Sequence, residues 1–176
     1  MNEICLRRPD ETMLEDIGRY RDEMLAAGDS LDGCSALERY ETVQAWLKHC
    51  RDMEQPETCP AHLVTATLFV AVRESDGRIV GMIDLRHRLN AFLAEYGGHI
   101  GYSVRPDERR KGYATRMLAL ALQEARSRGI NRVLVTCDED NEASRRTILR
   151  NGGVFDSNAW LESEKTNISR YWIELQ

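Results

Sequence analysis

The spacing of apolar residues predicts four helices in this chain. Apolar side chains recur at intervals of three or four residues in four segments, which is the pattern of a helix with one buried face. These segments lie at residues 11–27, 37–50, 117–128 and 141–150. Gly28 follows the first segment and Gly129 the third, and each indicates where a helix ends.

Seven further segments have the composition of β-strands, being short and rich in β-branched or aromatic residues. They lie at Glu3–Arg7, Leu63–Arg73, Ile79–Arg86, His99–Arg105, Asn131–Cys137, Val154–Leu161 and Ile168–Leu175. Asp76-Gly77 separates the second from the third and predicts a hairpin turn. The last two are expected to form an antiparallel pair, whereas residues 87–95 show no clear periodicity.

The predicted order of elements is therefore β-α-α-β-β-β-α-β-α-β-β. This order predicts an α+β or mixed α/β fold with about four helices and one β-α-β unit. The chain has 176 residues and no stretch with the composition of a linker, so residues 1–176 are predicted to form one domain.

Composition and charge restrict the class of protein further. Hydrophobic residues make up 42% and charged residues 30%, as in soluble globular proteins, and no apolar run is long enough to span a membrane. The formal net charge of −5 argues against binding along a nucleic-acid backbone. Five widely spaced cysteines without C-x-x-C, and histidines without ligand spacing, predict a reduced cytoplasmic protein with no metal site.

The segment Ser103–Thr115 carries the clearest chemical signal, because it joins a predicted strand to a predicted helix. Gly112 and Ala114 are small, so backbone amides can approach a ligand closely. The first N–H groups of a helix lack internal partners, and the helix dipole is positive there. Positive charge is added by three consecutive residues, Arg109, Arg110 and Lys111. A pyrophosphate is predicted to bind at such a site.

Two common phosphate loops do not fit this segment. The pattern G-x-x-x-x-G-K-[ST] fails because Lys111 precedes Gly112, and G-x-G-x-x-G is absent. The pattern that fits is [QR]-x-x-G-x-[GA], at Arg109, Gly112 and Ala114, preceded by V-x-P at Val104.

With this motif the sequence resembles the GNAT N-acetyltransferase superfamily, and within it a largely uncharacterised bacterial subgroup. Two later features agree. Asn141 opens a helix in the pattern N-x-x-S, where the family commonly has N-x-x-A. Gly152-Gly153 with Phe155 resembles the G-F that closes the family's motif region.

The resemblance implies a GNAT fold, with a central, mostly antiparallel sheet in which one parallel pair of strands splays apart. Acetyl-coenzyme A would lie as cosubstrate in the gap between the strand that ends at Val104 and the strand Arg132–Cys137. The amide of Val104 would face the thioester oxygen and stabilise the oxyanion. The other implied cofactor contacts are Arg109, Arg110, Lys111, Gly112, Tyr113, Ala114 and Thr115 for the pyrophosphate, and Asn141 and Ser144 for the pantetheine.

The catalytic residues follow less directly. Many family members carry a tyrosine four residues after the alanine of N-x-x-A, as general acid for the thiolate, but this chain has Ile148 there. Tyr102 or a water is the replacement to consider. His99, on the strand that leads to the acetyl site, and Glu95 are the candidates for the general base. The alternative, which the residue types favour, is that His99 is a packing residue of its strand and Tyr102 a residue of the core.

The expected activity is transfer of an acetyl group from acetyl-coenzyme A to a primary amine, by direct attack in a ternary complex. The acceptor would be a small-molecule or peptide amine. The alternative is a non-catalytic acyl-coenzyme A binding or regulatory module, which the absent tyrosine supports. Neither nucleic acid nor a membrane is an expected partner, and a homodimer is common in the family.

Overall fold

One mixed sheet of seven strands forms the centre of the described structure. The computed structural model describes residues 3–175, so residues 1, 2 and 176 of the predicted domain lie outside it. The strands are β1 (Ile4–Arg7), β2 (Ala66–Arg73), β3 (Ile79–Arg86), β4 (Ile100–Val104), β5 (Arg132–Asp138), β6 (Val154–Leu161) and β7 (Thr166–Glu174). Their spatial order is β1-β2-β3-β4-β5-β7-β6, and only the β4–β5 pair is parallel. The predicted element order and fold class are confirmed.

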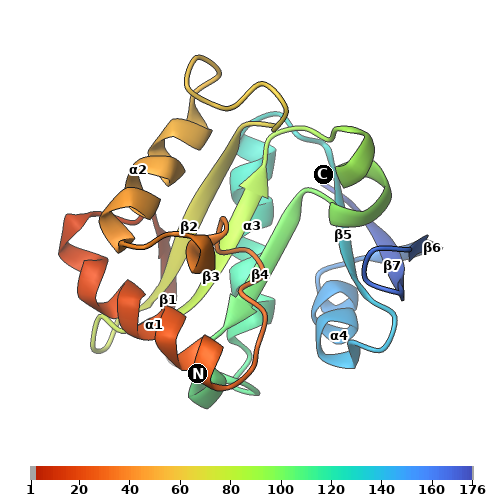
Figure 1. Cartoon of the computed structure of the whole chain (residues 1–176). Helices are drawn as coiled ribbons and strands as arrows, with labels where there is room; N and C mark the ends of the chain where they lie inside the picture. The colour runs from red at the N-terminus through yellow and green to blue at the C-terminus, as the bar shows by residue number, and fades with distance from the viewer. Residues whose placement is uncertain (1–2, 176) are drawn as a thin grey trace.

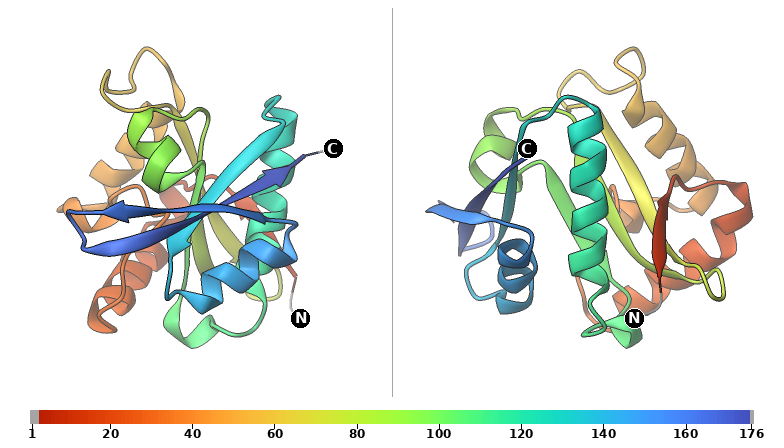
Figure 2. Two further views of the ribbon diagram at one scale, coloured as in Figure 1. Left: turned by 90° about the vertical axis from the view of Figure 1, so that its right-hand side faces the viewer. Right: turned by 180° about the vertical axis from the view of Figure 1, so that it is seen from behind.

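Four α-helices cover the two faces of the sheet. They are α1 (Leu14–Ala26), α2 (Val43–Glu54), α3 (Tyr113–Ser127) and α4 (Glu142–Arg150). Helices α1 and α2 lie in front of the sheet in the view of Figure 1. Helices α3 and α4 lie behind it, as the reverse view in Figure 2 shows. We call these two sides the front face and the back face. Among the described residues, no helix has the length and apolar character needed to cross a membrane.

Each face of the sheet has its own hydrophobic core. The front core joins α1 and α2 to β2 and β3, through residues that include Ile17, Tyr20, Trp46, Leu68 and Met82. The back core joins α3 and α4 to the middle strands, through residues that include Ile83, Ile100, Met117, Val135 and Ile148. Successive residues of a strand point to opposite faces, so β3 and β4 contribute side chains to both.

The second helix begins later than its periodicity predicts. Residues Leu37–Arg39 form a short 3-10 turn, and Tyr40 is extended. Helix α2 begins only after Thr42, whose side chain accepts a hydrogen bond from the amide of Ala45 (3.2 Å). Leu37 and Tyr40 pack into the same front core as α2, which is why the apolar spacing continues across the turn.

A short π-helical segment occupies residues Leu93–Gly97, where the sequence showed no periodicity. Asn90 begins it, since its side-chain oxygen accepts a hydrogen bond from the amide of Leu93 (2.9 Å). The segment lies against β5 and β6, and Thr136 of β5 donates to the carbonyl of Tyr96 (2.7 Å). It therefore closes one end of the space between β4 and β5.

Candidate functional site

Strands β4 and β5 separate almost as soon as they meet. Their only registered pair is Ile100 with Val135, although β4 continues to Val104. Figure 1 shows the two strands diverging toward the N-terminus of α4. We call this space the β4–β5 gap, with its closed end at Ile100 and its open end at Val104. The splayed parallel pair expected from the sequence is thus present.

Two backbone N–H groups of β4 point into this gap. On the other side of β4, the amide of Arg86 donates to the carbonyl of His99 (2.8 Å), and the amide of Arg105 donates to the carbonyl of Val80 (2.9 Å). Hydrogen-bonded pairs alternate along an antiparallel ladder, so every second residue of β4 bonds to β3. The residues between them, Tyr102 and Val104, direct their N–H groups toward β5.

The open end of the gap leads to the N-terminus of α3. Gly112 is the N-cap of this helix, with a φ of 85° that favours glycine. The first helical hydrogen bond of this turn runs from the amide of Arg116 to the carbonyl of Gly112 (3.2 Å). The amides of Tyr113, Ala114 and Thr115 come before it and have no helical acceptor. Three N–H groups are therefore presented together at the positive end of the helix dipole.

The cationic side chains of the motif are arranged differently from the simple phosphate cluster that the sequence suggested. Arg109 pairs with Asp29 (2.9 Å) and donates through Nε to the carbonyl of Val104 (3.1 Å). Lys111 donates to the carboxylate of Glu108 (2.8 Å). Within residues 3–175, Arg110 makes no ion pair, so it is the one cation of the motif whose charge is not paired with a carboxylate.

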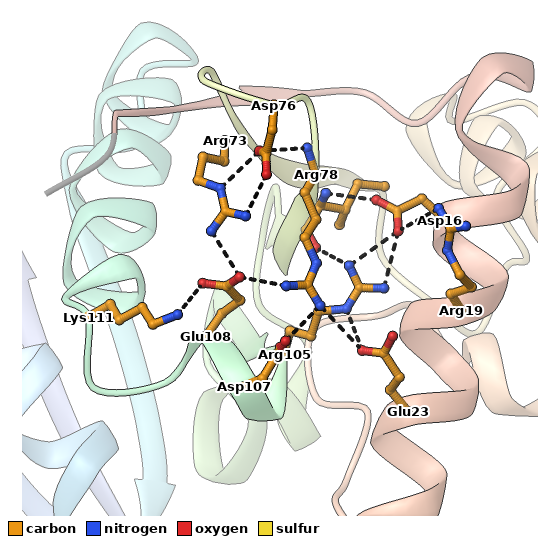
Figure 3. Close-up of polar contacts among 11 residues, drawn as sticks. Asp16, Arg19, Glu23, Arg73, Asp76, Arg78, Arg105, Asp107, Glu108 and Lys111 are labelled. Carbon is orange, nitrogen blue, oxygen red and sulfur yellow. Dashed lines mark hydrogen bonds and ion pairs between the residues drawn. The ribbon is translucent and has the colours of Figure 1, made fainter.

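A network of ion pairs holds the loop that precedes α3. Figure 3 shows that it joins α1, the β2–β3 hairpin and the loop after β4. Arg105 is 1% exposed, and it donates to Glu23 (2.6 Å), to Asp16 (3.1 Å) and to the carbonyl of Ile79 (2.7 Å). These contacts fix the point at which the chain leaves β4.

Glu108 is the centre of the second half of this network. Its carboxylate accepts hydrogen bonds from Arg73 (2.8 Å), Arg78 (2.7 Å) and Lys111 (2.8 Å), and the residue is 2% exposed. Burial alone would raise the pKa of Glu108, but the hydrogen bonds from Lys111 and Arg73 outweigh it and hold the pKa below its usual value. The carboxylate is therefore ionised, and it anchors the loop beneath the helix N-terminus.

Asn141 and Ser144 lie at the start of α4, beside the gap. The side chain of Asn141 caps the helix by accepting from the amide of Ser144 (3.0 Å). The hydroxyl of Ser144 is hydrogen-bonded to the hydroxyl of Tyr102 (2.7 Å). Tyr102 thus reaches across from β4 to the first turn of α4. Burial raises the pKa of Tyr102 to about 12, so its hydroxyl is protonated at neutral pH.

Ile148, at the position of the family's usual tyrosine, is a core residue. It is fully buried, and a Cβ at Gly153 would lie 2.4 Å from its Cγ2 atom. The packing of Ile148 therefore requires glycine at position 153. A tyrosine hydroxyl reaches the first turn of α4 from Tyr102 instead.

His99 joins β4 to β5 at the closed end of the gap. Its ring Nδ1 accepts a hydrogen bond from the amide of Leu134 (3.0 Å), and its own amide donates to the carbonyl of Leu134 (2.7 Å). Burial, with a smaller effect of Arg86, lowers the pKa of His99 to about 4. Its Nδ1 lone pair is already engaged, so this geometry favours a structural role for His99.

Glu95 lies in the π-helical segment and is exposed. The segment is at the closed end, whereas Val104 is four residues farther along β4 than Ile100. A strand rises about 3.3 Å per residue, so roughly 13 Å of β4 separates the two ends. The structure therefore does not bring Glu95 together with the motif residues.

The front face of β4 holds polar groups that the sequence did not single out. Asp84 of β3 is 7% exposed and is the register partner of Gly101. Ser103 is hydrogen-bonded to the hydroxyl of Tyr20 (3.0 Å) and to the thiol of Cys34 (3.3 Å). A single aspartate within the apolar strand Ile79–Leu85 was the available signal, because a carboxylate is seldom buried without a partner.

The loop between α1 and α2 passes in front of β4, as Figure 1 shows. A Cβ at Gly33 would lie 2.2 Å from the carbonyl oxygen of Gly101, so the loop is in direct contact with the strand. Ser35 and Ala36 follow in the left-handed region, with φ of 49° and 57°. Such conformations are costly for residues other than glycine.

The five cysteines are all free thiols, and three of them, Cys34, Cys50 and Cys137, are buried. Burial raises the pKa of Cys34 to about 12 and that of Cys137 to about 11. Both thiols are therefore neutral near pH 7 and poor nucleophiles. Among the described residues, no group of three or more histidine, cysteine, aspartate or glutamate side chains could hold a metal ion.

Comparison with known proteins identifies the family. The family model described as the acetyltransferase (GNAT) family matches residues 34–152, which is well over half of the chain. The chain therefore belongs to the GNAT family of acetyltransferases, and the resemblance seen in the sequence is confirmed. No curated protein matches the sequence.

Solved structures show the same fold at low identity. Ribosomal-protein-S5-alanine acetyltransferase from Vibrio fischeri has a TM-score of 0.72 at 16% identity, covering 99% of this chain and 94% of that one. The microcin C7 self-immunity acetyltransferase, solved with acetyl-CoA and AMP, has a TM-score of 0.71 at 17% identity, covering 99% and 94%. A Salmonella typhimurium acetyltransferase that modifies the N-terminal serine of ribosomal protein L7/L12 has a TM-score of 0.68 at 17% identity, covering 98% and 95%.

Proposed function

We propose that this protein transfers an acetyl group from acetyl-coenzyme A to a primary amine, by direct attack in a ternary complex. The observation that carries the proposal is the β4–β5 gap, with the free N–H groups of Tyr102 and Val104 at its side and the N-terminus of α3 at its open end. Family membership and the fold shared with an acetyltransferase solved with acetyl-CoA support it.

The described residues fit acetyl-coenzyme A as a substrate. The amides at the N-terminus of α3 suit its pyrophosphate, and Arg110 is the cation available to add charge. Arg109 and Lys111 act mainly by fixing the loop, since both already pair with carboxylates. The N–H groups of Val104 and Tyr102 serve the thioester oxygen and the pantetheine arm, and one such donor to an oxyanion contributes about 3 kcal/mol.

Tyr102 is the group we assign to the departing thiolate, with Ser144 holding its hydroxyl in place. A free thiol has a pKa of about 8.5. Full proton transfer from a tyrosine with a pKa of about 12 would therefore be uphill. We infer that Tyr102 donates a hydrogen bond that stabilises the thiolate, which then takes its proton from solvent. His99 is assigned no proton transfer, because its Nδ1 is bonded to the amide of Leu134.

The binding half of the proposal is tested at the two ends of α3. Gly112 and Gly129 both have positive φ, 85° and 78°, so alanine at either position costs about 1–2 kcal/mol of stability. Only Gly112→Ala alters the amides at the helix N-terminus. We expect it to weaken acetyl-coenzyme A binding at least about 10-fold in calorimetric titration, with Gly129→Ala as the matched control. Failure of the wild-type chain to bind acetyl-coenzyme A at millimolar concentration would contradict the proposal.

A non-catalytic acyl-coenzyme A binding module is the second candidate function, and the isoleucine at position 148 favours it. Free thiol released from acetyl-coenzyme A across a panel of primary amines separates the two. Release that depends on the amine supports the enzyme. Binding without release on any amine supports the binding module.

A further inference from the structure

Asp84 lies beside the β4–β5 gap, at the level of the Tyr102 N–H group. Of the two N–H groups that point into the gap, this one is closer to the closed end. The residue pairs with Gly101 in the β3–β4 ladder, and hydrogen-bonded partners have Cα atoms about 5.5 Å apart. Gly101 directly precedes Tyr102, whose N–H points into the gap. Asp84 is thus one strand away from the gap in which we propose that the thioester lies.

Side chains of β3 can reach across β4 at this point because Gly101 has none. The guanidinium of Arg86 demonstrates the reach: its Nη2 atom lies 3.4 Å from the place of a Cβ on Gly101. Its Nη1 atom donates to the carbonyls of Gly97 (2.9 Å) and Gly98 (3.3 Å), on the far side of the strand. Asp84 shares the face of Arg86, two residues closer to the open end.

The carboxylate of Asp84 has little to balance its charge. Its one ion pair among residues 3–175 is with Arg86, whose Nε lies 3.5 Å from Oδ2. The Nη1 atom of Arg86 donates to two backbone carbonyls and not to Asp84. The other titratable groups facing it are the thiols of Cys34, from the loop, and Cys50, from α2, and burial raises the pKa of both. Burying a carboxylate with so few partners is costly, and a second cation beside it would offset that cost.

We propose that Asp84 binds the ammonium group of the acceptor on the front face of β4 and accepts its first proton. The inference rests on the proposed function and names the base that it requires. The resulting amine nitrogen attacks the thioester carbon, a C–N bond forms, and the C–S bond breaks with its electron pair leaving on sulfur. The nitrogen loses its second proton to solvent, the thiolate takes a proton from solvent, and Asp84 releases its own after the product leaves.

The environment of the carboxylate suits this step. Burial raises the pKa of Asp84 to about 6, against a smaller opposing effect of Arg86. A base with a pKa close to the working pH is ionised and still binds a proton well.

The test compares Asp84→Asn with Asp22→Asn, the same chemical change at an exposed position of α1. The full-length chain is used, with acetyl-coenzyme A and a simple alkyl primary amine that the wild type acetylates. We expect Asp84→Asn to lower kcat/KM at neutral pH by about 100-fold or more. Asp22→Asn should stay within twofold of wild type, and both variants should bind acetyl-coenzyme A as the wild type does.

The pH profile separates proton transfer from a structural effect. With Asp84 as base, kcat/KM of the wild type should rise up to about pH 6 and then stay level below the pKa of the amine. The asparagine variant must use the rare neutral amine, so its kcat/KM should keep rising tenfold per pH unit. The defect should therefore shrink as pH rises.

Three outcomes are decisive. A defect that is the same at every pH, or a variant as active as wild type, overturns the role of Asp84 and leaves the proposed function standing. A wild-type chain that binds acetyl-coenzyme A but acetylates no amine overturns both. A defect that disappears near the pKa of the amine supports the role of Asp84.

Discussion

Single residues on β3 and β4 carry most of the proposed chemistry, and each can be tested by itself. Asp84 faces the front core and Tyr102 the back core, because neighbouring strands present their side chains in register. The amine and the thiolate would thus be served from opposite faces of one sheet. This separation keeps the proposed base and the proposed hydrogen-bond donor from interacting with each other.

The stability of the protein should show the titration of Asp84 directly. Its pKa is about 6 in the folded state, above the usual 3.8, so the folded chain binds this proton more tightly than the unfolded chain. Its stabilising contribution is full below about pH 4 and is lost as pH rises through 6. The free energy of unfolding of Asp84→Asn should therefore gain ~2 kcal/mol on the wild type between pH 4 and pH 7. Urea unfolding at both pH values measures it, and equal differences would argue against a raised pKa.

Removal of the Tyr102 hydroxyl should affect turnover more than binding. Tyr102→Phe keeps the ring in the back core and leaves Ser144 without its hydroxyl partner. We expect kcat to fall about 10- to 100-fold, with an unchanged Kd for acetyl-coenzyme A. Tyr40→Phe removes the hydroxyl of a residue that stacks on His49 of α2 and should leave kcat unaltered. A kcat of Tyr102→Phe equal to wild type would show that the thiolate leaves without this tyrosine.

At the scale of elements, the loop between β4 and α3 is held by charges more than by apolar contacts. Glu108→Gln would leave Arg73, Arg78 and Lys111 without their shared carboxylate in a buried position. We expect a loss of ~3–5 kcal/mol in the free energy of unfolding. Asp107→Asn is the control, because Asp107 is 59% exposed and its ion pair within residues 3–175 is with Arg78 alone. The loss for this variant should stay below ~1 kcal/mol. Similar losses for both variants would mean that Glu108 is no anchor.

The elements themselves could largely be predicted from periodicity, and the contacts between them could not. Ile79–Arg86 agrees residue for residue with β3, since its apolar run and the Asp76-Gly77 turn are local signals. Arg105 and Asp16 are distant in sequence, so nothing local indicates that they pair. For the same reason Arg109 looked free in the sequence, although it is paired with Asp29. Lys111 pairs with Glu108 only three residues away, and that local contact was not singled out from the sequence.

At the scale of the whole molecule, the two hydrophobic cores support different parts of the proposed site. The back core supports the N-termini of α3 and α4, where the cofactor contacts are proposed. The front core supports α1, α2 and the loop between them, which passes over Gly101. The acceptor would have to enter between this loop and β4, so the chemistry of the front layer would decide which amine is used.

The single pair Ile100–Val135 has a consequence for how the sheet behaves as a unit. It leaves β1–β4 and β5–β7 as two half-sheets joined by one registered pair and by the adjoining bond from the amide of His99 to the carbonyl of Leu134. Pantetheine carries two amide groups, so in the gap it would act as a short extra strand between the halves. The amide protons of Tyr102 and Val104 should then exchange with deuterium at least about 10-fold more slowly when acetyl-coenzyme A is bound, while those of Gly101 and Ser103, bonded to β3, should change little. The ligand would in that case complete the hydrogen bonding of a sheet that the polypeptide alone leaves divided.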